Sequence, residues 1–152
     1  MTFGNLIEAL GGKLGIEIED AGGAAAVETD GTTVVLQDAG ELLLLRAEVG
    51  EIPADGKETI LLSAMEANFL YQGTGGATLA VNHEDGRLHV HKYNWMERLD
   101  ADTVLDALER LSQTVAAWRQ VLADYRPEAE APSASETGSA PAAGMDFFRD
   151  FC

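Results

Sequence analysis

Residues 55–94, DGKETILLSAMEANFLYQGTGGATLAVNHEDGRLHVHKYN, decide the fold of this chain. They predict a helix that ends near Gln72, a break at Gly73, Gly75 and Gly76, and then a strand hairpin. At about 100° per residue the helix carries two apolar stripes, namely Ile60, Ala64, Ala67 and Tyr71, and Leu61, Leu62, Met65 and Phe69. One stripe is enough to cover the helix's own sheet. The second predicts burial against another molecule, and a second copy of the chain is favoured.

The residues before this stretch predict one helix and three strands. Thr2 is placed to cap a helix that ends at Gly15. Residues 16–19 alternate as at the start of a strand. Asp30-Gly31 is a strong hairpin signal between strands at residues 24–29 and 32–37, and a leucine-rich strand follows at residues 41–49.

The residues after the stretch predict a long helix. Asp100 is its N-cap, Leu99 and Val104 are placed as a hydrophobic staple, and Pro127 stops it. With strands at residues 77–81 and 87–93, the order becomes α-β-β-β-α-β-β-α. Because the hairpins are short, the sheet should be antiparallel. The predicted fold is therefore α+β, an antiparallel sheet of about five strands with three helices, in a homodimer.

Composition divides the chain into a folded domain at residues 1–126 and a tail at residues 127–152. The tail is acidic and rich in Pro, Ala and Ser, so we expect it to be disordered. It ends in MDFFRDFC, where Phe147, Phe148 and Phe151 are clustered. Two interpretations stay open for this segment: a mobile end, or a short motif that docks on this protein or on another one.

Charge and cysteine content restrict the partners and the compartment. The 152 residues carry 10 basic and 26 acidic side chains, a formal charge of −16. Nucleic acid and anionic membranes are therefore not expected to bind. The single cysteine, Cys152, allows no intrachain disulfide. We see no signal peptide and no apolar run long enough to span a membrane, so we expect the protein to be cytoplasmic.

No catalytic constellation is visible in the sequence, and we predict that the protein is not an enzyme and has no cofactor. Gly73, Gly75 and Gly76 follow a helix, whereas a phosphate loop precedes one. His89 and His91 share a strand face and could chelate a metal, but nothing completes a site, so no metal is predicted. Ser63 and Ser112 have no neighbouring base motif.

The segments MEANFLYQGTGGATLAVNHEDGRLHV, LDADTVLDALERL and VAAWRQVL, in this order, resemble small type III secretion system effector chaperones of the Tir-chaperone (CesT-like) family. The resemblance covers roughly residues 3–125, and residues 93–96 depart from the family pattern. It implies a cytoplasmic homodimer that binds the N-terminal region of a secreted effector and holds it soluble and non-globular for export. The alternative is a small dimeric regulatory module that sequesters a folded partner or a transcriptional regulator.

The resemblance also suggests which residues bind. Grooves for the effector would be lined by the first helix and the sheet, at Phe3, Leu6, Ile7, Leu10, Val34, Leu36, Leu42 and Leu44. Ordinary core packing is the alternative for each of these, because apolar periodicity does not show exposure. The dimer interface would use Leu61, Met65, Phe69, Leu79 and Trp95.

Overall fold

The computed structural model describes residues 1–127. The elements follow in the order α1 (Phe3–Leu14), β1 (Ala24–Thr29), β2 (Thr32–Ala39), β3 (Leu42–Glu51), α2 (Lys57–Asn68), β4 (Thr78–Val81), β5 (Arg87–Trp95) and α3 (Ala101–Asp124). Two short 3-10 helices, η1 (Phe69–Tyr71) and η2 (Met96–Arg98), follow α2 and β5. The predicted α+β class and the predicted element order are confirmed.

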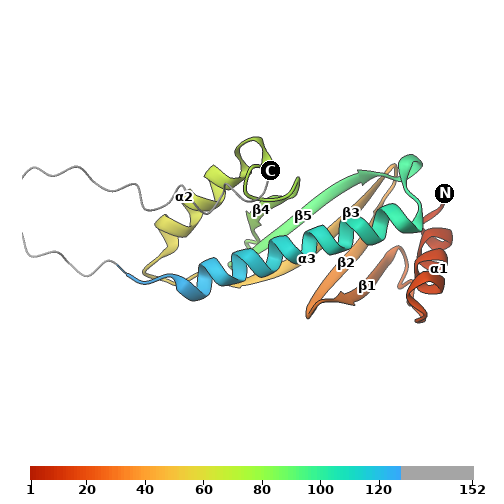
Figure 1. The fold of residues 1–152 in the computed structure, drawn as a ribbon, viewed down its shortest axis with the longest axis horizontal. Helices are drawn as coiled ribbons and strands as arrows, with labels where there is room; N and C mark the ends of the chain where they lie inside the picture. The colour runs from red at the N-terminus through yellow and green to blue at the C-terminus, as the bar shows by residue number, and fades with distance from the viewer. Residues whose placement is uncertain (128–152) are drawn as a thin grey trace, which may run out of the picture.

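The five strands form one antiparallel sheet in the order β1-β2-β3-β5-β4. Figure 1 shows α3 running along one face of this sheet. α1 lies near the start of α3, at one end of the sheet. α2 lies at the other end, near the end of α3. The described residues contain no helix that is long and apolar enough to cross a membrane.

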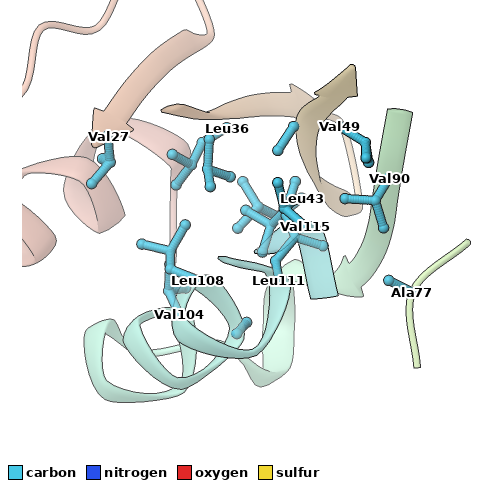
Figure 2. Close-up of a cluster of buried hydrophobic side chains, with 14 of the residues drawn as sticks. Val27, Leu36, Leu43, Val49, Ala77, Val90, Val104, Leu108, Leu111 and Val115 are labelled. Carbon is cyan, nitrogen blue, oxygen red and sulfur yellow. The ribbon is translucent and has the colours of Figure 1, made fainter. Parts of the chain in front are cut away.

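The core lies between α3 and the sheet face that α3 covers (Figure 2). Alternate residues of each strand point into it, because successive side chains of a strand point to opposite faces. The helix contributes residues spaced three and four apart, so that one stripe of α3 is buried. Together they include Val27, Leu36, Leu43, Val90, Val104, Leu108, Leu111, Val115 and Trp118.

Local signals predicted from sequence account for several boundaries. Thr2 Oγ1 accepts a hydrogen bond from Asn5 N–H, and Gly15 ends α1 in the left-handed region at φ 68°. Asp30 and Gly31 both have positive φ, at 49° and 70°. Positive φ at both positions is typical of the tight turn that matches strand twist in a hairpin. Asp100 caps α3 by accepting from Thr103 N–H at 2.8 Å.

The predicted strand start at residues 16–19 is wrong. These residues lie outside every strand and run close to α1, where a Cβ at Gly11 would stand 2.8 Å from the Ile16 carbonyl oxygen. Apolar and acidic residues alternate here because one side of the segment faces α1. An alternation with a period of two does not distinguish such a segment from a strand. The predicted tail, apart from Pro127, lies outside the described residues, so the boundary between domain and tail stays a prediction.

Arg119 of α3 links the helix to two places in the sheet, a β-bulge in β3 and the β1–β2 hairpin. Its guanidinium donates to Val49 O and Glu48 O, both at 3.1 Å, where the pairing of β3 with β5 shifts register. It also donates to Thr32 Oγ1 at 3.2 Å and to Gly31 O at 3.3 Å, in the β1–β2 turn. A planar guanidinium with five donors suits a site with four acceptors.

Replacing this side chain should therefore weaken the whole domain. We expect Arg119→Ala to lower the free energy of unfolding by about 1–3 kcal/mol, since charge-assisted hydrogen bonds are lost and backbone acceptors are left unpaired. Urea denaturation followed by circular dichroism measures the effect. Arg110→Ala, at an exposed position of the same helix, is the matched control. Equal stability of the two variants would contradict the assigned role of Arg119.

Candidate functional site

Helix α2 has a buried face and an exposed face, and both are apolar. Ile60, Ala64 and Ala67 are buried, whereas Leu62 and Met65 are 57% and 71% exposed. The sequence predicted this division into two stripes, one for the protein's own core and one for another surface. Two of the three buried residues, Ala64 and Ala67, are small and let α2 pack closely.

The first stripe was predicted to continue to Tyr71, and this part of the prediction is wrong. Tyr71 is 56% exposed because α2 ends at Asn68 and the chain changes direction. Leu70 and Tyr71 take the left-handed region, with φ of 54° and 57°. Two consecutive residues with side chains are rarely found there, and each costs about 1–3 kcal/mol. Contacts elsewhere must compensate for this conformation.

Asn68 supplies one such contact. Its side-chain amide donates to Leu79 O and accepts from Leu79 N–H, both at 2.9 Å. It thus takes the place of a neighbouring strand at the outer edge of β4. The turn also hydrogen-bonds to α3: Trp118 Nε1 donates to Gly73 O at 3.1 Å, and Thr114 Oγ1 donates to Thr74 O at 3.2 Å. The turn is fixed to both β4 and α3.

The consequence is a set of exposed apolar side chains on α2 and η1. We call it the α2 surface, and it comprises Leu62, Met65, Phe69, Leu70 and Tyr71. All five side chains are more than half exposed, and Phe69 and Leu70 reach 67% and 70%. Monomeric proteins rarely expose so many large apolar side chains side by side. The α2 surface is the first candidate for contact with another molecule.

The structure divides the residues predicted for a dimer interface. Met65 and Phe69 belong to the α2 surface, and Leu61 is half-buried on the same helix. Leu79 is only 4% exposed, because it points into the core from β4. Trp95 is 52% exposed but lies at the end of β5, away from α2 (Figure 1). Leu79 is therefore not available to a second copy, and Trp95 belongs to a different surface.

The second apolar surface lies on the sheet face opposite α3. Leu42 pairs with Trp95, and Leu44 pairs with Tyr93, across neighbouring strands β3 and β5. We call these four residues the open-sheet patch. Tyr93 and Trp95 are 54% and 52% exposed, and the two leucines are half-buried between their neighbours. A hollow of about 390 Å³, lined in part by Trp95, Gly40 and Met96, opens beside it.

The same sheet face becomes charged farther along β3 and β5. Arg46 pairs with His91 next to the patch, and Glu48 forms an ion pair with Arg87 beyond it. The His91 ring meets the Tyr93 ring edge-on, with centroids 5.9 Å apart. Burial lowers the pKa of the His91 imidazole, so its neutral form is favoured. The apolar patch therefore borders on a cationic side chain, Arg46.

Glu48, Asp85 and His89 place one potential metal-ligand atom each within 4.8 Å of one another. His89 Nε2 lies 3.1 Å from Asp85 Oδ2, and Arg87 is paired with Glu48. A hydrogen bond from the Arg87 backbone N–H is the main reason that the pKa of Asp85 lies below its usual value. Each carboxylate thus already has a partner. His91, considered above as a chelator together with His89, faces Tyr93 instead.

Most of the residues predicted to line an effector groove are in the core. Leu6, Leu10, Val34 and Leu36 are 0% exposed, and Phe3 and Ile7 are 5% and 3% exposed. The apolar stripe of α1 packs against the domain itself, including α3, and does not face solvent. Apolar periodicity identifies which face of a helix is buried but not what buries it. Of the eight predicted residues, Leu42 and Leu44 remain accessible, and both belong to the open-sheet patch.

Sequence reasoning missed Tyr93 and Leu70 as surface candidates. The exposure of Tyr93 could have been predicted, because it lies two and four positions after His91 and His89 in the same strand and so points to the same face. Leu62 lies in the second stripe of α2 but was not chosen as an interface residue. Leu70 had no sequence signal, because its exposure depends on the left-handed turn.

Comparison with known proteins gives a consistent result. The model of the Tir chaperone protein (CesT) family matches residues 5–119. Among solved structures, a chain of the HopA1–SchA chaperone–effector complex aligns with TM-score 0.64 and 20% identity, over 78% of this chain and 93% of that chain. A chain of the ExsC–ExsE complex aligns with TM-score 0.61 and 16% identity, over 78% and 91%.

A third similar structure is the heterodimeric ExoU–SpcU complex from the type III secretion system of Pseudomonas aeruginosa. It aligns with TM-score 0.58 and 18% identity, over 77% of this chain and 93% of that chain. At these identities the likeness shows the fold. No curated protein matches the sequence significantly.

The role of Asn68 can be tested directly. We expect Asn68→Ala to lower the free energy of unfolding by about 1–3 kcal/mol, because Leu79 loses both partners of its backbone groups. Hydrogen exchange at the Leu79 amide should also become faster. Gln72→Ala, at an exposed position of the same turn, is the control. Unchanged exchange at Leu79 would show that Asn68 does not hold the edge of β4.

Proposed function

Because this chain belongs to the Tir chaperone protein (CesT) family, we propose that it is a type III secretion chaperone. It binds the N-terminal region of a secreted effector and holds that region soluble and non-globular before export. Binding takes place in the cytoplasm and requires neither a cofactor nor a catalytic step. A regulatory module that sequesters a folded partner is the rival that the experiments below separate from it.

The open-sheet patch is the observation that carries this function. It offers two leucines and two aromatic rings on a preformed sheet, at a face that no described element covers. An unfolded client segment exposes apolar side chains that a folded protein would hide. Each leucine-sized side chain buried on such a patch contributes roughly 1.5–3 kcal/mol. Several such contacts are needed to offset the entropy lost when the client is ordered.

A free sheet edge adds a second way to hold an extended segment. β1 and β4 are the two edge strands of the sheet. At β4 the outward backbone groups of Leu79 are occupied by Asn68. No strand among residues 1–127 pairs with the outer side of β1. Strand addition at β1 would give the client backbone hydrogen bonds that do not depend on its sequence, as suits a partner held unfolded.

The α2 surface fits a second copy of the chain. In a twofold dimer the same patch meets itself, so a self-complementary apolar helix face is the simplest solution. The surface is aliphatic and aromatic at its centre, and Glu58 and Glu66 are exposed on the same helix. Pairing would bury the second stripe that a single domain leaves in water. The dimer is part of the proposed function, because it brings two client-binding surfaces together.

A substitution in the open-sheet patch tests client binding. We expect Leu44→Glu to weaken the affinity for the client roughly 10- to 100-fold, since one leucine contact of about 1.5–3 kcal/mol is lost and a charge is introduced. The client is obtained by isolating the protein from its native host and identifying bound polypeptides by mass spectrometry. Affinity for the client's N-terminal segment is then measured by titration calorimetry.

Ala116→Glu adds the same charge at an exposed position of α3, on the other side of the sheet, and should bind normally. Leu6→Glu is unsuitable, because Leu6 is 0% exposed and the variant would unfold. Normal binding by Leu44→Glu would refute the open-sheet patch as the client site. A client that stays folded and protease-resistant while bound would favour the regulatory rival.

A second substitution tests the dimer. We expect the unaltered protein to sediment as a dimer at micromolar concentration, and Phe69→Glu to give monomers or aggregates, because a charge is placed at the centre of an apolar interface. Sedimentation velocity across a dilution series distinguishes these states. Ala116→Glu should remain dimeric. A compact monomer in the unaltered protein, or an intact dimer in Phe69→Glu, would refute the α2 surface as the interface.

A further inference from the structure

The open-sheet patch has features that favour an aromatic ligand. Tyr93 and Trp95 offer two half-exposed rings, and aromatic side chains pair favourably by stacking or edge-to-face contact. Arg46 is the next residue of β3 after Leu44 that points to this face, and it carries a positive charge. Glu41 and Glu97 line the hollow on the other side of Trp95. The patch is thus an apolar strip with a cationic end and an acidic end.

The chain itself contains a segment of matching chemistry. Residues 145–152, MDFFRDFC, carry Phe147, Phe148 and Phe151, with Asp146 before them and Arg149 and Asp150 between the second and the third. This segment lies outside the described residues. The preceding residues 127–144 contain no aromatic residue and no leucine, isoleucine, valine or methionine. The aromatic segment is therefore the part of the sequence beyond Arg126 with enough apolar surface to dock.

The segment can reach the patch. Residues 128–144 can span at most about 56–61 Å when fully extended, at about 3.3–3.6 Å per residue. The 24 residues of α3 span about 36 Å. α3 ends next to Tyr125, and η2 connects Trp95 to the start of α3. The path from the end of α3 to the open-sheet patch is about the length of α3 plus the thickness of one sheet. This path is shorter than the span of residues 128–144.

Charge distinguishes the patch from the nearer α2 surface. Glu58 and Glu66 are exposed on α2 and would repel Asp146 and Asp150. On the sheet, Arg46 offers those aspartates an opposite charge, and Glu41 and Glu97 offer one to Arg149. Both surfaces carry two exposed rings, Phe69 and Tyr71 on the α2 surface and Tyr93 and Trp95 on the open-sheet patch, so charge is the feature that separates them.

We infer that residues 145–152 dock through their three phenylalanines on the open-sheet patch of their own chain. At an effective concentration of about 1 mM, a segment with a Kd of about 0.1 mM occupies its site about nine-tenths of the time. Such a segment shields the patch while no client is present and yields to a longer client with more contacts. The competition with a client rests on the proposed function, but the docking itself does not.

The two tryptophans make the docking measurable without a client. Trp118 is 2% exposed and Trp95 is 52% exposed, so acrylamide quenching of fluorescence reports mainly on Trp95. The test compares the full chain with the full chain carrying Phe147→Ser, Phe148→Ser and Phe151→Ser. We expect the Stern–Volmer constant to rise about twofold or more in the triple variant, because the patch changes from mostly covered to open.

Ala140→Ser, Ala142→Ser and Ala143→Ser together form the control and should quench like the unaltered chain. A synthetic peptide of residues 145–152, added under reducing conditions, should restore protection to the triple variant but not to one that also carries Leu44→Glu. Equal quenching of the unaltered chain and the triple variant would overturn the inference. So would protection that disappears on dilution, since a second copy of the chain would then be the occupant.

The quenching experiment needs no client, so its result is independent of the client-binding experiment. If client binding fails but the aromatic segment protects Trp95, the proposed function is refuted and the docking is supported. If the client binds and the triple variant shows no change in quenching, the docking is refuted and the proposed function is supported.

Discussion

The packing of α3 along one face of the sheet is the constraint on which the rest of the structure depends. Its buried stripe, which includes Leu108, Leu111 and Val115, contacts one set of alternate strand residues. Since neighbouring strand residues point to opposite faces, burying one set commits the other set to the outside. Leu42, Leu44, Tyr93 and Trp95 lie on the outer face of the sheet for this reason. Among residues 1–127, α3 is the long helix that packs along the sheet, and the opposite face stays uncovered.

Much of this arrangement could be predicted from sequence because it follows from local rules. The hairpin at Asp30-Gly31 depends on the turn residues alone, and the start of α3 depends on the cap at Asp100. The two stripes of α2 follow from helical periodicity and from the size of the domain. In each case the residues that carry the signal lie close together in the chain.

The failures have a common physical cause. Leu6 and Leu10 in α1 have the pattern of an apolar helix face, but only tertiary packing decides whether the protein's own core or a partner covers that face. Tyr71 is exposed because the chain turns left-handed after α2, and that turn is held by bonds from Asn68 to Leu79 and from Trp118 to Gly73. These partners are 11 and 45 positions apart in the sequence. Helical periodicity carries no information about them.

The same long-range bonds connect the two exposed surfaces. α2 is joined to β4 by the Asn68 amide, and β4 pairs with β5, where Thr78 lies opposite His91. β5 then continues through Tyr93 to Trp95 in the open-sheet patch. The connection contains a paired strand and no flexible linker. A dimer formed through the α2 surface would therefore hold its two sheet patches in a fixed relation. A client long enough to contact both would bind the second at high effective concentration, so modest patches on each protomer suffice for stable capture.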